Sequence, residues 1–144
     1  MIYLDTSALV KRYVREKGSD RIEETLLSAD MVSISKLAFP ELLSALAKKR
    51  RSHDLTEKSF RIAVNRFDED WKDFLIVDFH DDLFPIIRTV ITKHALRGAD
   101  AVHLSSPLWL TQSSRLPVVF CASDAQLITA ARAESLETLD PENA

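Results

Sequence analysis

The sequence has few of the residues that build phosphate-binding loops or covalent cross-links. Among 144 residues it contains two glycines and one cysteine. Gly18 and Gly98 stand too far apart for a glycine-rich nucleotide-binding motif, which excludes that class of site. The single Cys121 excludes an internal disulfide and suits a reducing cytosol, and its apolar neighbours predict a buried thiol. No apolar run approaches the roughly 18 residues of a membrane span, and no signal-like segment opens the sequence, so we expect a cytoplasmic chain without membrane contact.

The composition is that of an ordinary globular protein. Hydrophobic residues make up 46% of the chain and charged residues 28%, with a net charge of −3. A slightly acidic chain is not a general nucleic-acid coating protein, although local basic patches remain compatible with it. The length favours a single domain over residues 1–144.

Strand-like and helix-like segments alternate along the chain. Strands separated by one or two helices predict an α/β fold, a three-layer α/β/α sandwich around a mostly parallel sheet. We expect Pro107 to kink or stop its helix and residues 141–144 to form a frayed tail. The predicted strands are 2–4, 31–35, 74–77, 118–121 and 137–139, and the predicted helices are an early one from about residue 8, then 19–29, 37–51, 56–71, 83–94, 99–110 and 125–134.

The first segment provides a rule for choosing candidate site residues. Three apolar residues, Ile2 to Leu4, lead into Asp5, Thr6 and Ser7 and then into an amphipathic pattern. This order predicts a buried strand, a tight turn and a helix start. Ligands of open α/β sheets bind at the carboxyl ends of the strands, where Asp5 would lie.

Three further acids occupy equivalent positions, at a strand end or in the first turn of the next helix: Glu41, Asp100 and Asp124. Each on its own is also explained as a helix cap or as a partner of the helix dipole. Together they would be crowded, because two charges about 4 Å apart repel by roughly 4 kcal/mol at an effective dielectric of about 20. A cluster of oxygen ligands would persist with a hard divalent cation, Mg²⁺ or Mn²⁺.

The histidines offer no competing metal site. His53, His80, His94 and His103 are scattered along the chain without metal-ligand spacing. His103, one helical turn after Asp100, is interpreted as a packed histidine or as one that supports the acids.

The chain resembles the PIN-domain nucleases and, within them, the VapC-type toxins of bacterial type II toxin–antitoxin systems. The matching segments are IYLDTSALV at residues 2–10, PELLSAL at 40–46, LRGADAVHL at 96–104 and FCASDAQL at 120–127. The resemblance implies a PIN-like fold and a Mg²⁺- or Mn²⁺-dependent endoribonuclease whose products carry 5′-phosphate and 3′-hydroxyl ends. It implies a catalytic quartet of Asp5, Glu41, Asp100 and Asp124, with Asp5, Asp100 and Asp124 on the metal and Thr6 and Ser123 as auxiliary hydroxyls.

The resemblance also implies three partners: an RNA substrate, a VapB-like protein antitoxin and a second copy of the chain. Basic residues near two of the acids are candidate RNA contacts, namely Lys48, Lys49, Arg50, Arg51 and Arg97. Cations at a helix C-terminus equally complement the helix dipole, so the run 48–51 has two interpretations.

Other functions stay open at this point. One is a housekeeping PIN nuclease in RNA processing or DNA metabolism, which gene context would distinguish from a toxin. Another is a non-catalytic interaction module, which a divalent-ion titration would test. A phosphatase with Asp5 as nucleophile is disfavoured, because the position two residues on, where its second acid is expected, holds Ser7.

Overall fold

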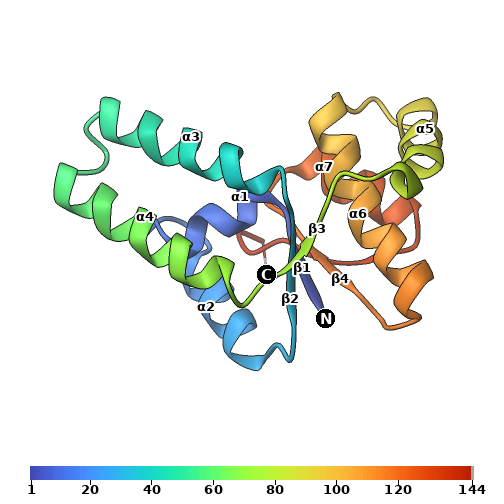
Figure 1. Ribbon diagram of the computed structural model, residues 1–144, viewed down its shortest axis with the longest axis horizontal. Coiled ribbons are helices and arrows are strands. Elements are labelled where there is room, and N and C mark those ends of the chain that lie inside the picture. The colour runs from blue at the N-terminus through green and yellow to red at the C-terminus, as the bar shows by residue number, and fades with distance from the viewer. Residues whose placement is uncertain (144) are drawn as a thin grey trace.

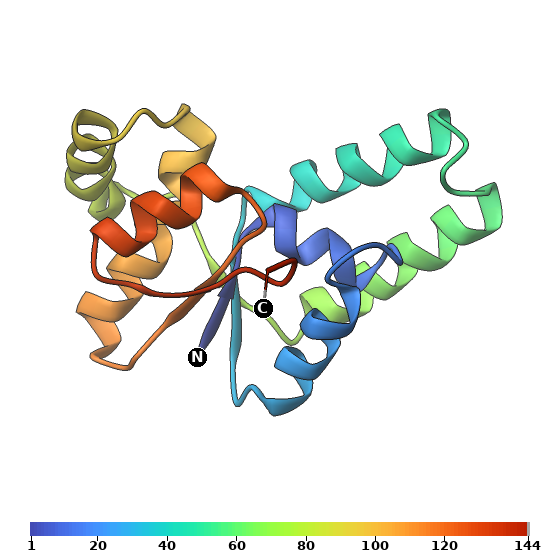
Figure 2. The same cartoon turned by 180° about the vertical axis from the view of Figure 1, so that it is seen from behind.

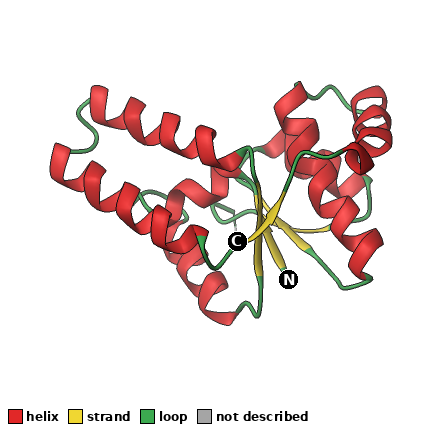
Figure 3. Cartoon of the chain, in the orientation of Figure 1, coloured by secondary structure: helices red, strands yellow, loops and turns green. Residues whose placement is uncertain are grey.

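The computed structural model describes residues 1–143 and arranges them in three layers, with a parallel sheet between two groups of helices (Figure 1). Within these residues the sheet has five strands in the order β3-β2-β1-β4-β5, and every neighbouring pair is parallel. The predicted α/β/α sandwich is therefore confirmed (Figure 3). The strands are β1 (Ile2–Leu4), β2 (Val32–Ser35), β3 (Leu75–Val77), β4 (Val119–Cys121) and β5 (Glu137–Leu139).

Helices α1 to α4 lie on one side of the sheet and α5 to α7 on the other, as the front and back views both show (Figures 1 and 2). The hairpin of α3 and α4 extends away from the sheet. None of the helices within residues 1–143 has the length and apolar character needed to cross a membrane. The helices are α1 (Thr6–Leu9), α2 (Ser19–Ser28), α3 (Ala38–Arg51), α4 (Glu57–Trp71), α5 (Phe84–Lys93), α6 (Gly98–Ser114) and α7 (Ala125–Ala133), with 3₁₀ turns η1 (Val10–Arg12) and η2 (Asp81–Leu83).

The two central strands each contribute to two hydrophobic cores. Tyr3 of β1 stacks on Phe120 of β4 with ring centroids 5.8 Å apart, in the core shared with α5 to α7. The next residues, Leu4 and Cys121, point into the core shared with α1 to α4. Successive side chains of a strand face opposite sides of the sheet, so two apolar neighbours bury both faces. The predicted burial of Cys121 is confirmed.

The prediction that Pro107 could stop its helix is wrong. Helix α6 runs through Pro107 to Ser114, and every residue from 101 to 107 is buried. A proline inside a helix costs about 3 kcal/mol. Burial of a whole helical segment outweighs that cost here, since tertiary packing stabilises helices more than propensity does.

The predicted frayed tail is also wrong for residues 141–143, while Ala144 lies outside the described residues. Pro141 is buried, and the carboxylate of Glu142 accepts a hydrogen bond of 2.6 Å from Lys11. The same ammonium group lies 3.1 Å from Glu16. Glu142 is thus held against Lys11 of η1, the segment that follows α1.

The order of the strands fixes where a ligand can bind. From β1 the chain moves outward in one direction through β2 and β3, and from β4 it moves in the other direction to β5. The crevice of a doubly wound sheet opens where the order reverses, at the carboxyl ends of the strands. In this fold that place lies between β1 and β4, directly before Asp5 and Asp124.

Candidate functional site

Asp5 lies at the carboxyl end of β1 and is 5% exposed. One carboxylate oxygen, Oδ2, caps α1 by accepting from the backbone N–H of Ser7 at 3.2 Å and from its hydroxyl at 2.6 Å. The other oxygen, Oδ1, lies 3.6 Å from Nδ1 of His103. The cap interpretation therefore accounts for one oxygen of Asp5 and leaves the second oxygen, beside His103, without a role in the cap.

Asp124 follows β4 in the same way and caps α7, with Oδ1 accepting from the N–H of Leu127 at 3.1 Å. The loop before it is tied to the loop after β1, because the N–H of Ser123 donates to the hydroxyl of Ser7 at 2.9 Å. Ser7 in turn donates to Asp5, so a short chain of hydrogen bonds joins the two strand ends. The hydroxyl of Ser123 is buried and has no hydrogen-bond partner among residues 1–143.

Asp100 lies in the first turn of α6 and is electrostatically coupled to both acids. Burial raises its pKa most, and the carboxylates of Asp5 and Asp124 raise it further. Arg97, whose Nε lies 3.8 Å from Asp100, opposes that rise without cancelling it. The negative charges of Asp5 and Asp124 thus disfavour the ionised form of Asp100.

Glu41, in the first turn of α3, is held by two donors. Its Oε1 accepts from the hydroxyl of Thr6 at 2.8 Å and from Nε2 of His103. Burial alone would raise the pKa of Glu41, but these hydrogen bonds outweigh it and hold the pKa below its usual value. Thr6 and Glu41 therefore form a direct contact between α1 and α3.

His103 lies closer to the acids than the sequence allowed us to assign. Its ring contacts Glu41 and faces Asp5, and it is 1% exposed. Burial would lower the pKa of this imidazole, but the hydrogen bond to Glu41 and the charges of Asp5, Glu41 and Asp100 raise it. The sequence signals for His103 were its position one turn after Asp100 and its place in the matching segment at residues 96–104.

The residues suited to a metal ion are Asp5, Asp100 and Asp124. Their chemistry fits a hard cation, since the donors are carboxylate oxygens and Arg97 does not cancel the rise in the pKa of Asp100. The unpartnered hydroxyl of Ser123 is an additional oxygen beside them. Within residues 1–143, however, no three acidic, imidazole or thiol groups already converge on one point at metal-binding distances.

The candidate RNA contacts lie in different environments. Lys48 and Arg97 line one groove of about 780 Å³ together with Thr6 and Glu41. Lys49 pairs with Glu16 at 3.3 Å. The guanidinium of Arg50 lies over Phe60, 4.0 Å from the ring centroid, and near Glu57, while Arg51 is exposed.

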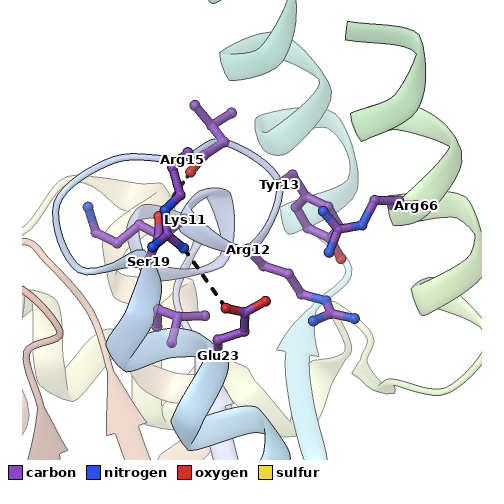
Figure 4. A pocket seen from close by; sticks show the side chains of 9 residues that line it. Lys11, Arg12, Tyr13, Arg15, Ser19, Glu23 and Arg66 are labelled. Atoms are coloured by element: carbon purple, nitrogen blue, oxygen red, sulfur yellow. Dashed lines mark hydrogen bonds and ion pairs between the residues drawn. The ribbon is translucent and has the colours of Figure 1, made fainter. Parts of the chain in front are cut away.

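A second polar cavity, of about 280 Å³, lies between η1, α2 and α4 (Figure 4). Figure 4 shows Arg66 reaching from α4 toward the ring of Tyr13, and the guanidinium lies 5.9 Å from the ring centroid. Arg12 at its edge is already engaged, donating to Asp70 through two nitrogens. The cavity lining, as far as residues 1–143 define it, includes none of the four acids.

The chain is similar to several known proteins. Residues 2–108 match the PIN domain family. The chain is 38% identical over 112 residues to Ribonuclease VapC45 and to Ribonuclease VapC49, both of Mycobacterium tuberculosis, with 75% of each chain covered.

Two solved structures show the same fold. The structure of FitAcB from Neisseria gonorrhoeae has a TM-score of 0.72 at 18% identity, with 100% of both chains covered. That of VapBC2 from Rickettsia felis, bound to a DNA fragment from its promoter, has a TM-score of 0.66 at 15% identity, covering 97% of this chain and 98% of the other. With the family match and the sequence relatives, the conclusion is that this chain belongs to the PIN-domain family, alongside the VapC proteins.

Proposed function

We propose that the chain is a Mg²⁺- or Mn²⁺-dependent endoribonuclease and the toxin of a VapBC-type toxin–antitoxin pair. The observation that carries the proposal is the placement of Asp5 and Asp124 at the ends of the neighbouring strands β1 and β4, joined through Ser7 and Ser123. Asp100 lies near enough to both acids that their charges raise its pKa. Like-charged groups that a fold brings close together are suited to an external cation, because opposite charge favours their ionised forms. The ribonuclease names of the sequence relatives support RNA as the substrate.

The four acids divide the work. Asp5 and Asp100 would hold the ion directly, Asp124 would share it or hold its water ligands, and Glu41 would orient the attacking water. A bound divalent ion would supply a more acidic water and would stabilise negative charge on the phosphate. Thr6 holds the Glu41 carboxylate, and the Ser123 hydroxyl is available to a water or an ion ligand.

The RNA backbone lies in the groove lined by Thr6, Glu41, Lys48 and Arg97. The two cations come from different helices and stand on the same groove as a catalytic acid, which suits a phosphate chain that passes the reactive centre. Lys49, Arg50 and Arg51 remain weaker candidates, since two of them have partners within the chain.

The proposal includes a VapB-like antitoxin and a homodimer. Support for the antitoxin comes from the solved relatives, which include a toxin–antitoxin complex from Klebsiella pneumoniae with a TM-score of 0.64 at 14% identity. RNA and such a partner are found in the cytoplasm, where we place the activity. The alternative, a housekeeping PIN nuclease, uses the same acids and differs in gene context.

The experiment is RNA cleavage by the purified chain, with Asp5→Asn as the matched control. We expect cleavage with Mg²⁺ or Mn²⁺, none after chelation and none by Asp5→Asn, whose circular dichroism spectrum should match that of the parent. End mapping after induced expression should give 5′-phosphate and 3′-hydroxyl termini. Equal cleavage by Asp5→Asn, or cleavage in the presence of a chelator, would exclude the proposed mechanism.

A further inference from the structure

His103 connects side chains from four elements. It lies on α6 and is 1% exposed, and its two ring nitrogens face in different directions. Around it lie Tyr3 of β1, Asp5 at the end of that strand, Thr6 of α1 and Glu41 of α3. Two of these four neighbours are acids of the catalytic quartet.

The Nε2 side of the ring holds Glu41. Nε2 donates to Oε1 of Glu41, and the hydroxyl of Thr6 donates to the same oxygen at 2.8 Å. A glutamate side chain has several rotatable bonds, and fixing it costs up to about 2 kcal/mol of conformational free energy. Donors from two separate helices restrict Glu41 to one orientation and leave its second oxygen, Oε2, for other partners.

The Nδ1 side of the His103 ring faces the end of β1. Nδ1 lies 3.3 Å from the hydroxyl of Tyr3 and 3.6 Å from Oδ1 of Asp5. A histidine that only fills space in a core is replaceable by an apolar side chain of similar volume, and burying its polar nitrogens carries a cost. Here both ring nitrogens face polar groups of the site, and these contacts offset the cost of burying them.

We propose that His103 is a positioning residue of the nuclease, which holds the carboxylate of Glu41 in a fixed position relative to that of Asp5. The inference rests on the proposed function, because it concerns the step in which Glu41 orients water. His103 acts through Glu41, and Thr6 is the second support of the same carboxylate.

The test is a double-mutant cycle in kcat and KM for RNA cleavage. His103→Leu should lower kcat by about 10- to 100-fold, the range seen when an outer partner of a catalytic ligand is lost, with little change in KM. His103→Gln should recover most of kcat, because its amide nitrogen can replace Nε2 as a donor to Glu41. In a Glu41→Gln background, His103→Leu should cause no further loss.

Multiplicative losses in the cycle, or an unchanged kcat in His103→Leu, would overturn the proposal. Thermal unfolding of each variant identifies any that fails to fold. If His103→Leu fails to fold, His103→Gln is tested in its place.

A readout without RNA separates this inference from the proposed function. The imidazole N–H proton of His103 should give a downfield NMR signal that shifts or vanishes in Glu41→Gln. A parent chain that cleaves no RNA would refute the proposed function, whereas a signal unaffected by Glu41→Gln would refute the positioning contact.

Discussion

Two regions of the molecule surround a partly buried carboxylate with groups of opposite effect on its pKa. In the first, Asp70 accepts from Arg12 at 2.6 and 3.1 Å and from the hydroxyl of Tyr13 at 2.7 Å. Burial would raise the pKa of Asp70, but these donors outweigh it and hold the pKa below its usual value. In the second region, burial and neighbouring acids raise the pKa of Asp100.

The difference separates structural charge from functional charge. The chain supplies a matching cation where Asp70 joins η1 to α4, so the charge stabilises the fold. At the crevice the chain brings acids together and supplies too little positive charge to balance them. A fold tolerates such repulsion at a site that binds a cation, and perturbed carboxylates in a cleft are typical of functional sites.

The largest expected effect is on catalysis at the unbalanced region. Replacing Asp100 by Asn removes one proposed metal ligand and should lower RNA cleavage by at least about 100-fold. It also removes repulsion, so the melting temperature in the absence of metal should be equal to or higher than that of the parent. Single-turnover cleavage and thermal unfolding measure the two effects, and a clearly lower melting temperature would show that Asp100 is a structural charge.

Asp70→Asn tests the other region and should have the opposite effects on stability and cleavage. It breaks charge-assisted hydrogen bonds and should lower the free energy of unfolding by about 1.5–3 kcal/mol, while cleavage by the folded enzyme stays within a few-fold of the parent. Urea unfolding monitored by circular dichroism gives the stability. If Asp70→Asn removed cleavage without loss of stability, the two regions would have exchanged roles.

The pH dependence of stability should also have opposite signs. Because the pKa of Asp70 is lowered on folding, its contribution is present above the ordinary carboxyl pKa of about 3.9 and is lost as the pH falls through the folded value. The deficit of Asp70→Asn should therefore shrink below about pH 4. Because the pKa of Asp100 is raised, its charge costs stability at neutral pH, and any gain in Asp100→Asn should diminish as the medium becomes acidic. Unfolding free energies measured across this range without metal would test both signs.

The smallest expected effect concerns RNA binding. Arg97→Gln and Lys48→Gln should each weaken binding of a non-cleaved RNA, and each lost phosphate contact should reduce the slope of log K against log salt by about 0.7. Arg132 on α7 donates to Thr138 outside this groove, so Arg132→Gln is the matched control. Equal slopes of log K against log salt for all three variants would show that RNA does not bind in this groove.

The sequence predicted the parts of this molecule that depend on local pattern. Asp5 and Asp124 could be selected because each follows an apolar strand, and the cap interpretation and the site interpretation were never exclusive, since each residue has two oxygens. The buried strand over residues 2–4 was likewise predicted from its apolar run, and the helix over residues 37–51, observed at Ala38–Arg51, was predicted from its apolar stripe.

What the sequence did not predict depends on contacts between distant residues. Lys11 and Glu142 are 131 positions apart, and no local signal links them. The contact of His103 with Glu41 spans 62 positions. Helix α6 is buried on all sides around Pro107, so it lacks the amphipathic pattern from which its length could have been judged.

Binding of Mn²⁺ to the purified chain, measured by titration without RNA, tests the central claim most directly. We predict saturable binding that raises the melting temperature, that is lost in Asp5→Asn and Asp100→Asn, and that persists in Asp70→Asn. Failure of the parent chain to bind Mn²⁺, or equal binding by Asp100→Asn, would contradict the claim that the crevice acids are left unbalanced for a cation.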